Sequence, residues 1–362
     1  MDLLFSCAGR RNYLLRYFRE ALGGTGKIIA TDRDSSAPAM AEADIAEVVP
    51  EVYAPDYIDR LLDICRKHTV RAVIPLNDLD LPILACAKHR FLNENIFPVV
   101  SDSDVIDMCF DKWKTFSFIE HLGLKSPQTY LSLETARAAL DSGELRFPLV
   151  VKPRWGSGSI GIEFVYNYDE LSCAYPLVAA KINRSVLKQA SRADAERAIL
   201  IQEKIEGTEF GLDIVNDLDG RYQGTIMKRK LAMRAGETDK AVSVDDTELR
   251  RIGKIIACAS KHIGNLDCDI LERDGIYRVL ELNPRFGGGY PFSHLAGANV
   301  PRAILAWLAG TQAECLTPRI GVTGAKFDTL LEIHCEVSAS APSNNAYRND
   351  PPVKLGKGVA VG

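Results

Sequence analysis

The segment 277–291, YRVLELNPRFGGGYP, carries polar side chains at alternate positions of an expected strand. Glu281, Asn283 and Arg285 follow an apolar run, and Pro284 ends the strand before three glycines. Alternate positions of a strand share one face, so a carboxylate, an amide oxygen and a guanidinium are expected to point the same way. Such a set can bind a metal ion and a phosphoryl group together.

A second acidic strand is expected just before this one, in the hairpin LDCDILERDGIYRVLELN. Asp267 and Asp269 alternate on it, and Asp274-Gly275 is a favourable two-residue turn. If the register brings the two faces together, these acids lie beside Glu281 and Asn283. Mg²⁺ is typically held by one or two carboxylates plus substrate phosphates. A lone acidic strand face is usually only solvated, but the combined set favours a metal site.

A glycine-rich loop occurs in VVKPRWGSGSIGIEFVY, where Gly156, Gly158 and Gly161 have a G-x-G-x-x-G spacing. β-Branched and aromatic residues follow Gly161, so the loop is expected to join two strands, whereas a dinucleotide-binding loop leads into a helix. Backbone N–H groups of glycines can approach phosphate oxygens closely, and Lys152 at the end of the incoming strand is a natural phosphate partner. The alternative is a mobile surface hairpin without a ligand.

A basic cluster lies between these two motifs, in MKRKLAMRAGETDKA. Its members are Lys228, Arg229, Lys230 and Arg234. Such clusters are most often solvated, but this one is expected in a hairpin near the phosphate end of the site. Arg234, next to Gly236, is the candidate to reach the triphosphate or a carboxylate substrate. Further on, His294 is either a general base of the acceptor pocket or a packed histidine.

The composition indicates a globular enzyme of two or three packed units. The chain has 362 residues, with 46% hydrophobic and 25% charged, and the net charge of -4 gives no reason to expect a nucleic-acid partner. No apolar run is long enough to span a bilayer, and the first residues do not resemble a secretory leader. The nine cysteines are scattered singly, which favours reduced thiols in the cytoplasm over a zinc site or disulfides.

The first hundred residues alternate between expected strands and helices, which predicts a doubly wound parallel α/β unit. The strands are expected at 2–6, 27–32, 71–76 and 97–101, and the helices at 11–22, 55–68 and 80–93. Asp32 ends the second strand, but G-x-G-x-x-G is missing after the first, where only Gly9 is present. A docking or substrate-contributing domain is therefore expected in preference to a dinucleotide-binding one.

The rest of the chain predicts two α+β lobes. Strands flank the glycine loop, a helix follows at 168–190, and two hairpins surround a helix at 246–264. The expected domains are 1–108, 109–200 for a small lobe with a lid, and 201–337 for a large lobe with the metal and phosphate site. Residues 338–362 are polar and rich in Pro and Gly, and are expected to be a disordered tail.

The ordered set VVKP, the glycine-rich hairpin, IQEKIEGTEF and LELNPR resembles the ATP-grasp superfamily. The likeness is to carbamoyl-phosphate-synthase-like members and small carboxylate–amine ligases, and covers nearly all of residues 1–337. The resemblance implies a Rossmann-like pre-ATP-grasp domain followed by a two-lobed ATP-grasp domain. Of these motifs, E-x-N-P-R and the order of the set are specific, whereas the glycine loop alone is not.

The resemblance also implies roles for individual residues. The nucleotide-binding set is Lys112, Lys152, the lid loop Gly156, Ser157, Gly158, Ser159 and Gly161, the adenine-reading hinge Glu203, Lys204 and Ile205, and the ribose-binding Glu209. The metal ligands are Asp267, Glu281 and Asn283, with Asp269 as the rival of Asp267. By the resemblance, Arg285 would hold an acyl phosphate, and Arg234 and Lys230 of the basic cluster complete the expected catalytic set.

The implied chemistry is carboxylate activation by ATP with two Mg²⁺ ions, for which Mn²⁺ is an alternative. The γ-phosphoryl group would convert a small-molecule carboxylate into an acyl phosphate, which an amine or ammonia would attack, while a lid excludes water. Phosphorylation of bicarbonate or carbamate, and nucleotide binding without catalysis, remain alternatives. No nucleic-acid or membrane partner is expected, and a homodimer is left open.

Overall fold

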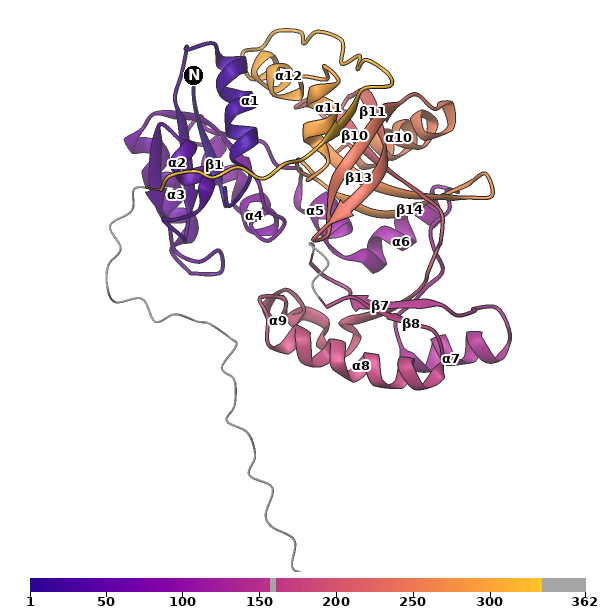
Figure 1. The fold of residues 1–362 in the computed structure, drawn as a ribbon. Helices are drawn as coiled ribbons and strands as arrows, with labels where there is room; N and C mark the ends of the chain where they lie inside the picture. Colours follow the sequence, from indigo (N-terminus) through magenta and orange to yellow (C-terminus); the bar gives the residue numbers. More distant parts are fainter. Residues whose placement is uncertain (157–160, 334–362) are drawn as a thin grey trace, which may run out of the picture.

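In the computed structural model, residues 1–156 and 161–333 are described, and they form three β-sheets with helices packed around them (Figure 1). The expected tail, 338–362, lies outside these residues. Among the described helices, none has both the length and the hydropathy needed to cross a bilayer.

The N-terminal sheet is parallel, in the order β3-β2-β1-β4-β5, which confirms the predicted α/β unit. Its strands are β1 (Asp2–Ser6), β2 (Ile28–Asp32), β3 (Ile45–Val48), β4 (Val70–Pro75) and β5 (Phe97–Pro98). Its helices are α1 (Asn12–Leu22), α2 (Pro38–Glu42), α3 (Tyr57–Lys67) and α4 (Leu81–Leu92). The Asp32 carboxylate accepts a hydrogen bond from the Gly9 N–H at 2.9 Å, so it stabilises the turn after β1.

The small lobe is an antiparallel sheet in the order β6-β9-β7-β8. Its strands are β6 (Thr129–Tyr130), β7 (Leu149–Pro153), β8 (Glu163–Val165) and β9 (Ile199–Glu203). The helices α5 (Ser103–Phe110) and α6 (Lys112–His121) precede this sheet in the chain and pack against the large lobe. The helices of the small lobe are α7 (Leu133–Asp141), α8 (Tyr168–Asn183) and α9 (Leu187–Ala190), followed by the 3₁₀ segment η1 (Arg192–Arg197). Figure 1 shows α8 on the side of this sheet that faces away from the large lobe. The opposite face therefore looks toward the large lobe.

The large lobe is an antiparallel sheet in the order β14-β13-β10-β11-β12-β15. Its strands are β10 (Thr208–Asn216), β11 (Tyr222–Arg234), β12 (Glu237–Val244), β13 (Gly264–Arg273), β14 (Ile276–Asn283) and β15 (Thr323–Ala325). Its helices are α10 (Thr247–Ser260), α11 (Tyr290–Leu295) and α12 (Val300–Leu308). Leu212, Met227, Ile252 and Ile256 are buried in the core under α10.

The hairpin of β13 and β14 has the register that the metal-site prediction required. Asp267 pairs with Asn283, and Asp269 pairs with Glu281. Both residues of the turn 274–275 have positive φ, which matches the Asp-Gly signal in the sequence. Side chains of directly paired residues lie on the same face of a sheet, so the two acids of β13 lie beside the acid and amide of β14.

A β-bulge in β14 produces this register. The pairing shifts between Asp269 and Ile270, because Ile270 pairs with Val279 and leaves Leu280 as the extra residue. Val279 is buried in the core, whereas Leu280 and Glu281 both line the cleft between the lobes. Without the extra residue, continued alternation from the turn would place Asp269 opposite Leu280. The bulge is therefore what aligns Glu281 with the acids of β13.

The N-terminal domain shares a core with the large lobe. Phe18 of α1 packs edge-on against Phe286, with ring centroids 5.9 Å apart, and α1 lies against α12 (Figure 1). The loops after β1 and β4 thereby reach the segment after β14. Arg11 donates to the Phe286 carbonyl at 2.9 Å, and Asp78 forms an ion pair with Arg285. The packing brings the carboxyl ends of the parallel strands to the edge of the predicted site.

Candidate active site

A cleft of about 360 Å³ lies between the small sheet and the large sheet. This volume is in the usual range for small-molecule sites. The cleft is lined by most of the residues predicted to bind a nucleotide, namely Lys112, Lys152, Gly156, Glu203, Lys204, Ile205 and Glu209. Asp269 and Glu281 of the hairpin also line it. Ser157, Gly158 and Ser159 of the glycine loop lie outside the described residues, and Gly161 resumes the chain beside Pro153.

Two lysines lie at one end of the cleft. The buried Lys152 ammonium donates to Gln202 Oε1 at 2.7 Å, and Lys112 Nζ donates to the carbonyl of Gly156. Burial and the nearby Lys112 charge lower the pKa of Lys152 to about 8. An anion placed between the two ammonium groups would relieve this repulsion. Gln202, which orients Lys152, has no recognisable signal in the sequence.

The other end of the cleft is formed where β9 leads into β10. The Lys204 ammonium pairs with Glu206 at 2.8 Å and lies 5.4 Å from the ring centroids of both Phe164 and Tyr166. Ile205 is buried, and its side chain adds an apolar wall. A flat apolar group could pack here, beside backbone groups of the hinge.

Lys230 lies between two acids of the cleft. Its ammonium is 2.7 Å from Glu209 Oε1 and 2.7 Å from Asp269 Oδ1, and its side chain is only 6% exposed. Burial lowers the pKa of Lys230, but Asp269 and Glu209 outweigh burial and raise it above its ordinary value. Lys230 is thus a buried charge within the site and does not belong to a solvated face.

The paired strands of the hairpin concentrate acidic groups. Burial, and then the neighbouring Asp269 charge, raises the pKa of Asp267 to about 7. The nearby cations therefore do not fully neutralise the carboxylates of this face. Asn283 Nδ2 donates to Glu281 Oε1 at 3.4 Å. Within residues 1–156 and 161–333, no three His, Cys, Asp or Glu side chains form a metal-binding group by themselves. The donor set thus fits an ion that takes one or two carboxylates, an amide oxygen and phosphate oxygens.

The two rival aspartates differ in their partners. Asp269 is paired with Lys230 at 2.7 Å, whereas Asp267 Oδ2 is 3.5 Å from Arg285 Nη1. The longer contact leaves Asp267 the weaker ion pair of the two. This difference favours Asp267 as the residue that would bind a cation, although Asp269 lines the cleft, and the choice between the two stays a prediction.

Arg285 is buried at the boundary with the N-terminal domain. Its Nη2 is 2.7 Å from Asp78 Oδ2, and its Nε has no hydrogen-bond partner within the described residues. Burial lowers the pKa of Arg285, but the charges of Asp78 and Asp267 raise it above its usual value. Asp78 follows β4 and was not identified from the sequence, because nothing local marks it as a partner of a residue about two hundred positions away.

The remaining members of the basic cluster have different environments. Lys228 is buried and pairs with Asp213 at 2.7 Å, and the strand register places both on the same face of the sheet as Asp267. Arg234 lies at the tip of the hairpin of β11 and β12, where its half-exposed guanidinium pairs with Asp239 and Asp328. Arg234 does not line the cleft.

The segment after Arg285 packs closely on the acidic face. A Cβ added at Gly287 would lie 2.1 Å from the Asp267 carboxylate, and one at Gly288 would lie 3.0 Å from Glu237. Only a residue without a side chain fits beside Asp267. His294 stacks on Tyr17, with ring centroids 3.7 Å apart, and burial lowers its pKa. These contacts favour the packed histidine over the general base.

Two family models match separate parts of the chain. The PylC-like N-terminal domain matches residues 3–100, and the ATP-grasp domain found in a biosynthetic pathway with the Ter operon matches residues 195–326. A carbamoyl phosphate synthase large chain from Halobacterium salinarum is 24% identical over 326 residues, which cover 86% of this chain. This chain spans only 29% of the length of that relative.

Solved structures share the fold at low identity. The biotin carboxylase domain dimer of the Hydrogenobacter thermophilus 2-oxoglutarate carboxylase, solved with MgADP, ADP and bicarbonate, has a TM-score of 0.68 and 17% identity and covers 89% of this chain and 73% of its own. The L-amino acid ligase from Bacillus licheniformis has a TM-score of 0.65 and 21% identity, with 88% and 78% covered. These matches agree with the motifs and with the order of the sheets. The family models therefore identify a PylC-like N-terminal domain at residues 3–100 and an ATP-grasp domain at residues 195–326.

Proposed function

We propose that the protein is an ATP- and Mg²⁺-dependent ligase, which activates a small-molecule carboxylate as an acyl phosphate for attack by an amine or ammonia. The observation that carries the proposal is that one cleft brings together Lys112, Lys152 and the 203–205 hinge with the acidic hairpin. These groups come from the small sheet, from the large sheet and from the start of α6. The order of the motifs and the ligase relatives support the same chemistry.

In this proposal the two ends of the cleft have separate tasks. Glu203, Lys204 and Ile205 hold adenine through backbone and apolar contacts, and Glu209 binds the ribose. Lys112 and Lys152 neutralise the phosphates, which is most of what phosphoryl transfer requires from a protein. Lys230 lies between Glu209 and Asp269 and pairs with both, so its charge reduces the repulsion between the two carboxylates.

The acidic hairpin would hold the metal through Asp267, Glu281 and Asn283. Mg²⁺ bound there would neutralise the negative charge of the phosphate groups. Arg285 keeps a planar fork beside this face, and its contact with Asp267 orients it. Its proposed task is to grip the transferring phosphoryl group or the acyl phosphate. Arg234 would act only if its hairpin tip moved toward the substrate.

The experiment is a screen for phosphate release from MgATP with purified protein. Amino acids and other carboxylates are tested singly and in pairs, with and without ammonia. The expected result is ADP and phosphate formation that needs both a carboxylate and an amine. If the protein binds ADP but releases no phosphate with any pair, it is a nucleotide-binding module and the ligase proposal fails.

A carbamoyl-phosphate-synthase-like reaction is the second candidate, because the Halobacterium salinarum relative is a carbamoyl phosphate synthase large chain. It predicts ATP cleavage that depends on bicarbonate and is indifferent to amino acids. The same screen distinguishes the two reactions when bicarbonate is removed from the buffer.

We extend the proposal to a cytoplasmic homodimer without nucleic-acid or membrane partners, which sedimentation velocity and binding assays would test.

A further inference from the structure

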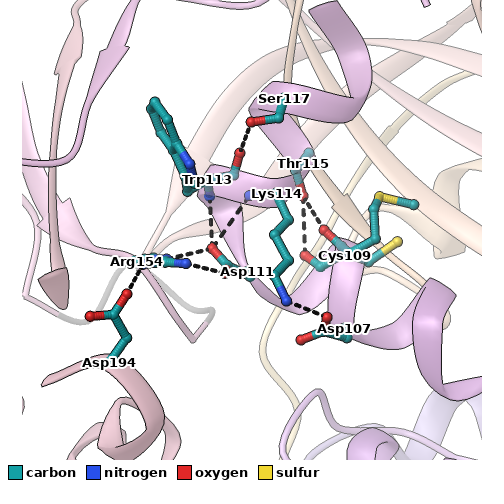
Figure 2. Close-up of polar contacts among 10 residues, drawn as sticks. Asp107, Cys109, Asp111, Trp113, Lys114, Thr115, Ser117, Arg154 and Asp194 are labelled. Carbon is teal, nitrogen blue, oxygen red and sulfur yellow. Dashed lines mark hydrogen bonds and ion pairs between the residues drawn. The ribbon is translucent and has the colours of Figure 1, made fainter. Parts of the chain in front are cut away.

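A buried ion pair joins the start of α6 to the end of β7. Arg154 Nε donates to Asp111 Oδ1 at 2.7 Å, and Arg154 Nη2 donates to Asp111 Oδ2 at 2.7 Å (Figure 2). The two residues are 7% and 1% exposed. Two parallel bonds from one guanidinium to one carboxylate fix orientation as well as distance. Neither the motifs nor the proposed chemistry gives this pair a task.

The same carboxylate caps α6. Asp111 Oδ1 accepts from the backbone N–H groups of Trp113 at 3.0 Å and Lys114 at 3.4 Å. The N–H of Lys112 donates to the carbonyl of Arg154 at 3.1 Å. The backbone of Lys112, the first residue of the helix, is therefore held by the cap on one side and by Arg154 on the other.

Arg154 also makes contacts on both sides of the segment that leads into the glycine loop. Its guanidinium lies 4.4 Å from the ring centroid of Trp155 and donates to Asp194 of η1 at 2.8 Å. Gly156 follows directly, and its carbonyl accepts from Lys112 Nζ. Asp111 directly precedes Lys112, and Arg154 lies two residues before Gly156. The ion pair thus sets the separation between Lys112 and Gly156.

We propose that Asp111 and Arg154 are positioning residues, which set the affinity of the cleft for phosphate groups through Lys112 and leave its affinity for adenosine unchanged. The inference rests on the proposed nucleotide-binding function of the cleft. Its physical basis is separation along β7, because Leu149 at the start of the strand pairs with Glu203 of the hinge, whereas Pro153 at its end leads to Arg154 and Gly156. A displaced lysine would lose phosphate contacts and leave the hinge intact.

The test compares ADP and adenosine on the same variants. Arg154→Lys keeps the charge but loses the fork, and Asp111→Asn keeps a good helix cap but loses the charge. The matched control is Asp107→Asn, which removes the exposed pair of Asp107 with Lys114, one turn away (Figure 2). Calorimetry measures ADP affinity, and ligand-observed NMR measures adenosine affinity. Lys112→Ala gives the reference for complete loss of the lysine.

Both pair variants should bind ADP about ten- to a hundredfold more weakly, the scale expected when a positioned group moves by about 1 Å. Adenosine affinity should stay within about twofold, and the control should match wild type for both ligands. Wild-type ADP affinity in both variants, with weakened binding in Lys112→Ala, would overturn the inference alone. Equal losses of ADP and adenosine affinity would show a merely structural pair and would also overturn it. Wild-type protein that binds no ADP would refute the proposed function, and this inference with it.

Discussion

Replacing Gly287 by alanine should disable the metal face without changing any charged residue. The backbone at Gly287 does not have positive φ, so alanine is conformationally acceptable there. The obstacle is space, because the new Cβ would lie 2.1 Å from the Asp267 carboxylate, whereas ordinary contacts lie at 3.4–4 Å. Either the carboxylate or the loop must move by about 1 Å or more.

The expected loss follows from that displacement. The Asp267 side chain is 13% exposed and is paired with Arg285, so it has little room to rotate away. A misplacement of about 1 Å at a catalytic group costs on the order of a hundredfold in rate, equivalent to about 2.7 kcal/mol of barrier. Overpacking should also lower the free energy of unfolding by about 1–3 kcal/mol.

The assay is MgATP turnover with the best substrate pair, together with thermal unfolding. Gly288→Ala is the matched control, because its Cβ would meet only the end of Glu237, a longer side chain that is 52% exposed. The control should stay within about twofold of wild type. Equal activity of Gly287→Ala and wild type, or equal loss in both variants, would refute the placement of Asp267 in the metal face.

Four further outcomes are expected. Glu281→Gln should leave unfolding unchanged and lower Mg²⁺-dependent ATP turnover by about two orders of magnitude or more, and turnover at the wild-type rate would remove Glu281 from the metal set. ADP affinity should fall as pH rises from 7 to 9.5, because Lys152, with a pKa of about 8, becomes a neutral amine above that pH, whereas phosphate binds the ammonium. Lys152→Arg should abolish this pH dependence, which titration calorimetry can check. MgADP should raise the melting temperature and NADH should not, since the turn after β1 lacks the dinucleotide fingerprint; a shift with NADH alone would reverse the assignment of the two halves. Burial lowers the pKa of His262 to about 4, and its Nε2 is 3.0 Å from the Ile214 carbonyl. As the pH falls, the unfolded chain therefore takes up the proton first, and the stability present above pH 6.5 is lost toward pH 4. Denaturant titrations at the two pH values should show a loss of about 3 kcal/mol in the free energy of unfolding of wild type, and no such loss in His262→Gln.

Much of the fold could be predicted because the chain alternates apolar strands with amphipathic helices. Within the N-terminal domain, the missed elements were α2 and β3, which precede α3. β3 lies at the edge of its sheet, and its side chains alternate between half-buried and exposed, so it lacks the continuous apolar run of an inner parallel strand. Short edge elements of this kind are defined by their neighbour β2 and not by their own sequence.

The candidate site could be predicted only where its residues lie close together in sequence. Glu281, Asn283 and Arg285 are two positions apart, and Lys152 lies beside its glycine loop, so local spacing revealed them. Asp78 meets Arg285 only because two domains pack together, and Asp111 meets Arg154 although 43 positions separate them in sequence. No periodicity encodes such pairs.

The extra residue in β14 divides one strand into two segments with different tasks. Residues 276–279 follow an alternation that is set by the turn and serves the core, whereas residues 281–283 follow an alternation that serves the acidic face. An exchange of Val279 for another apolar residue should therefore change packing and leave the acidic face in place. An inserted residue between Leu280 and Glu281 would do the reverse, and would turn the acid and the amide toward the core without disturbing the turn. The two functions of this hairpin can thus change independently in evolution, provided that the junction between them keeps its length.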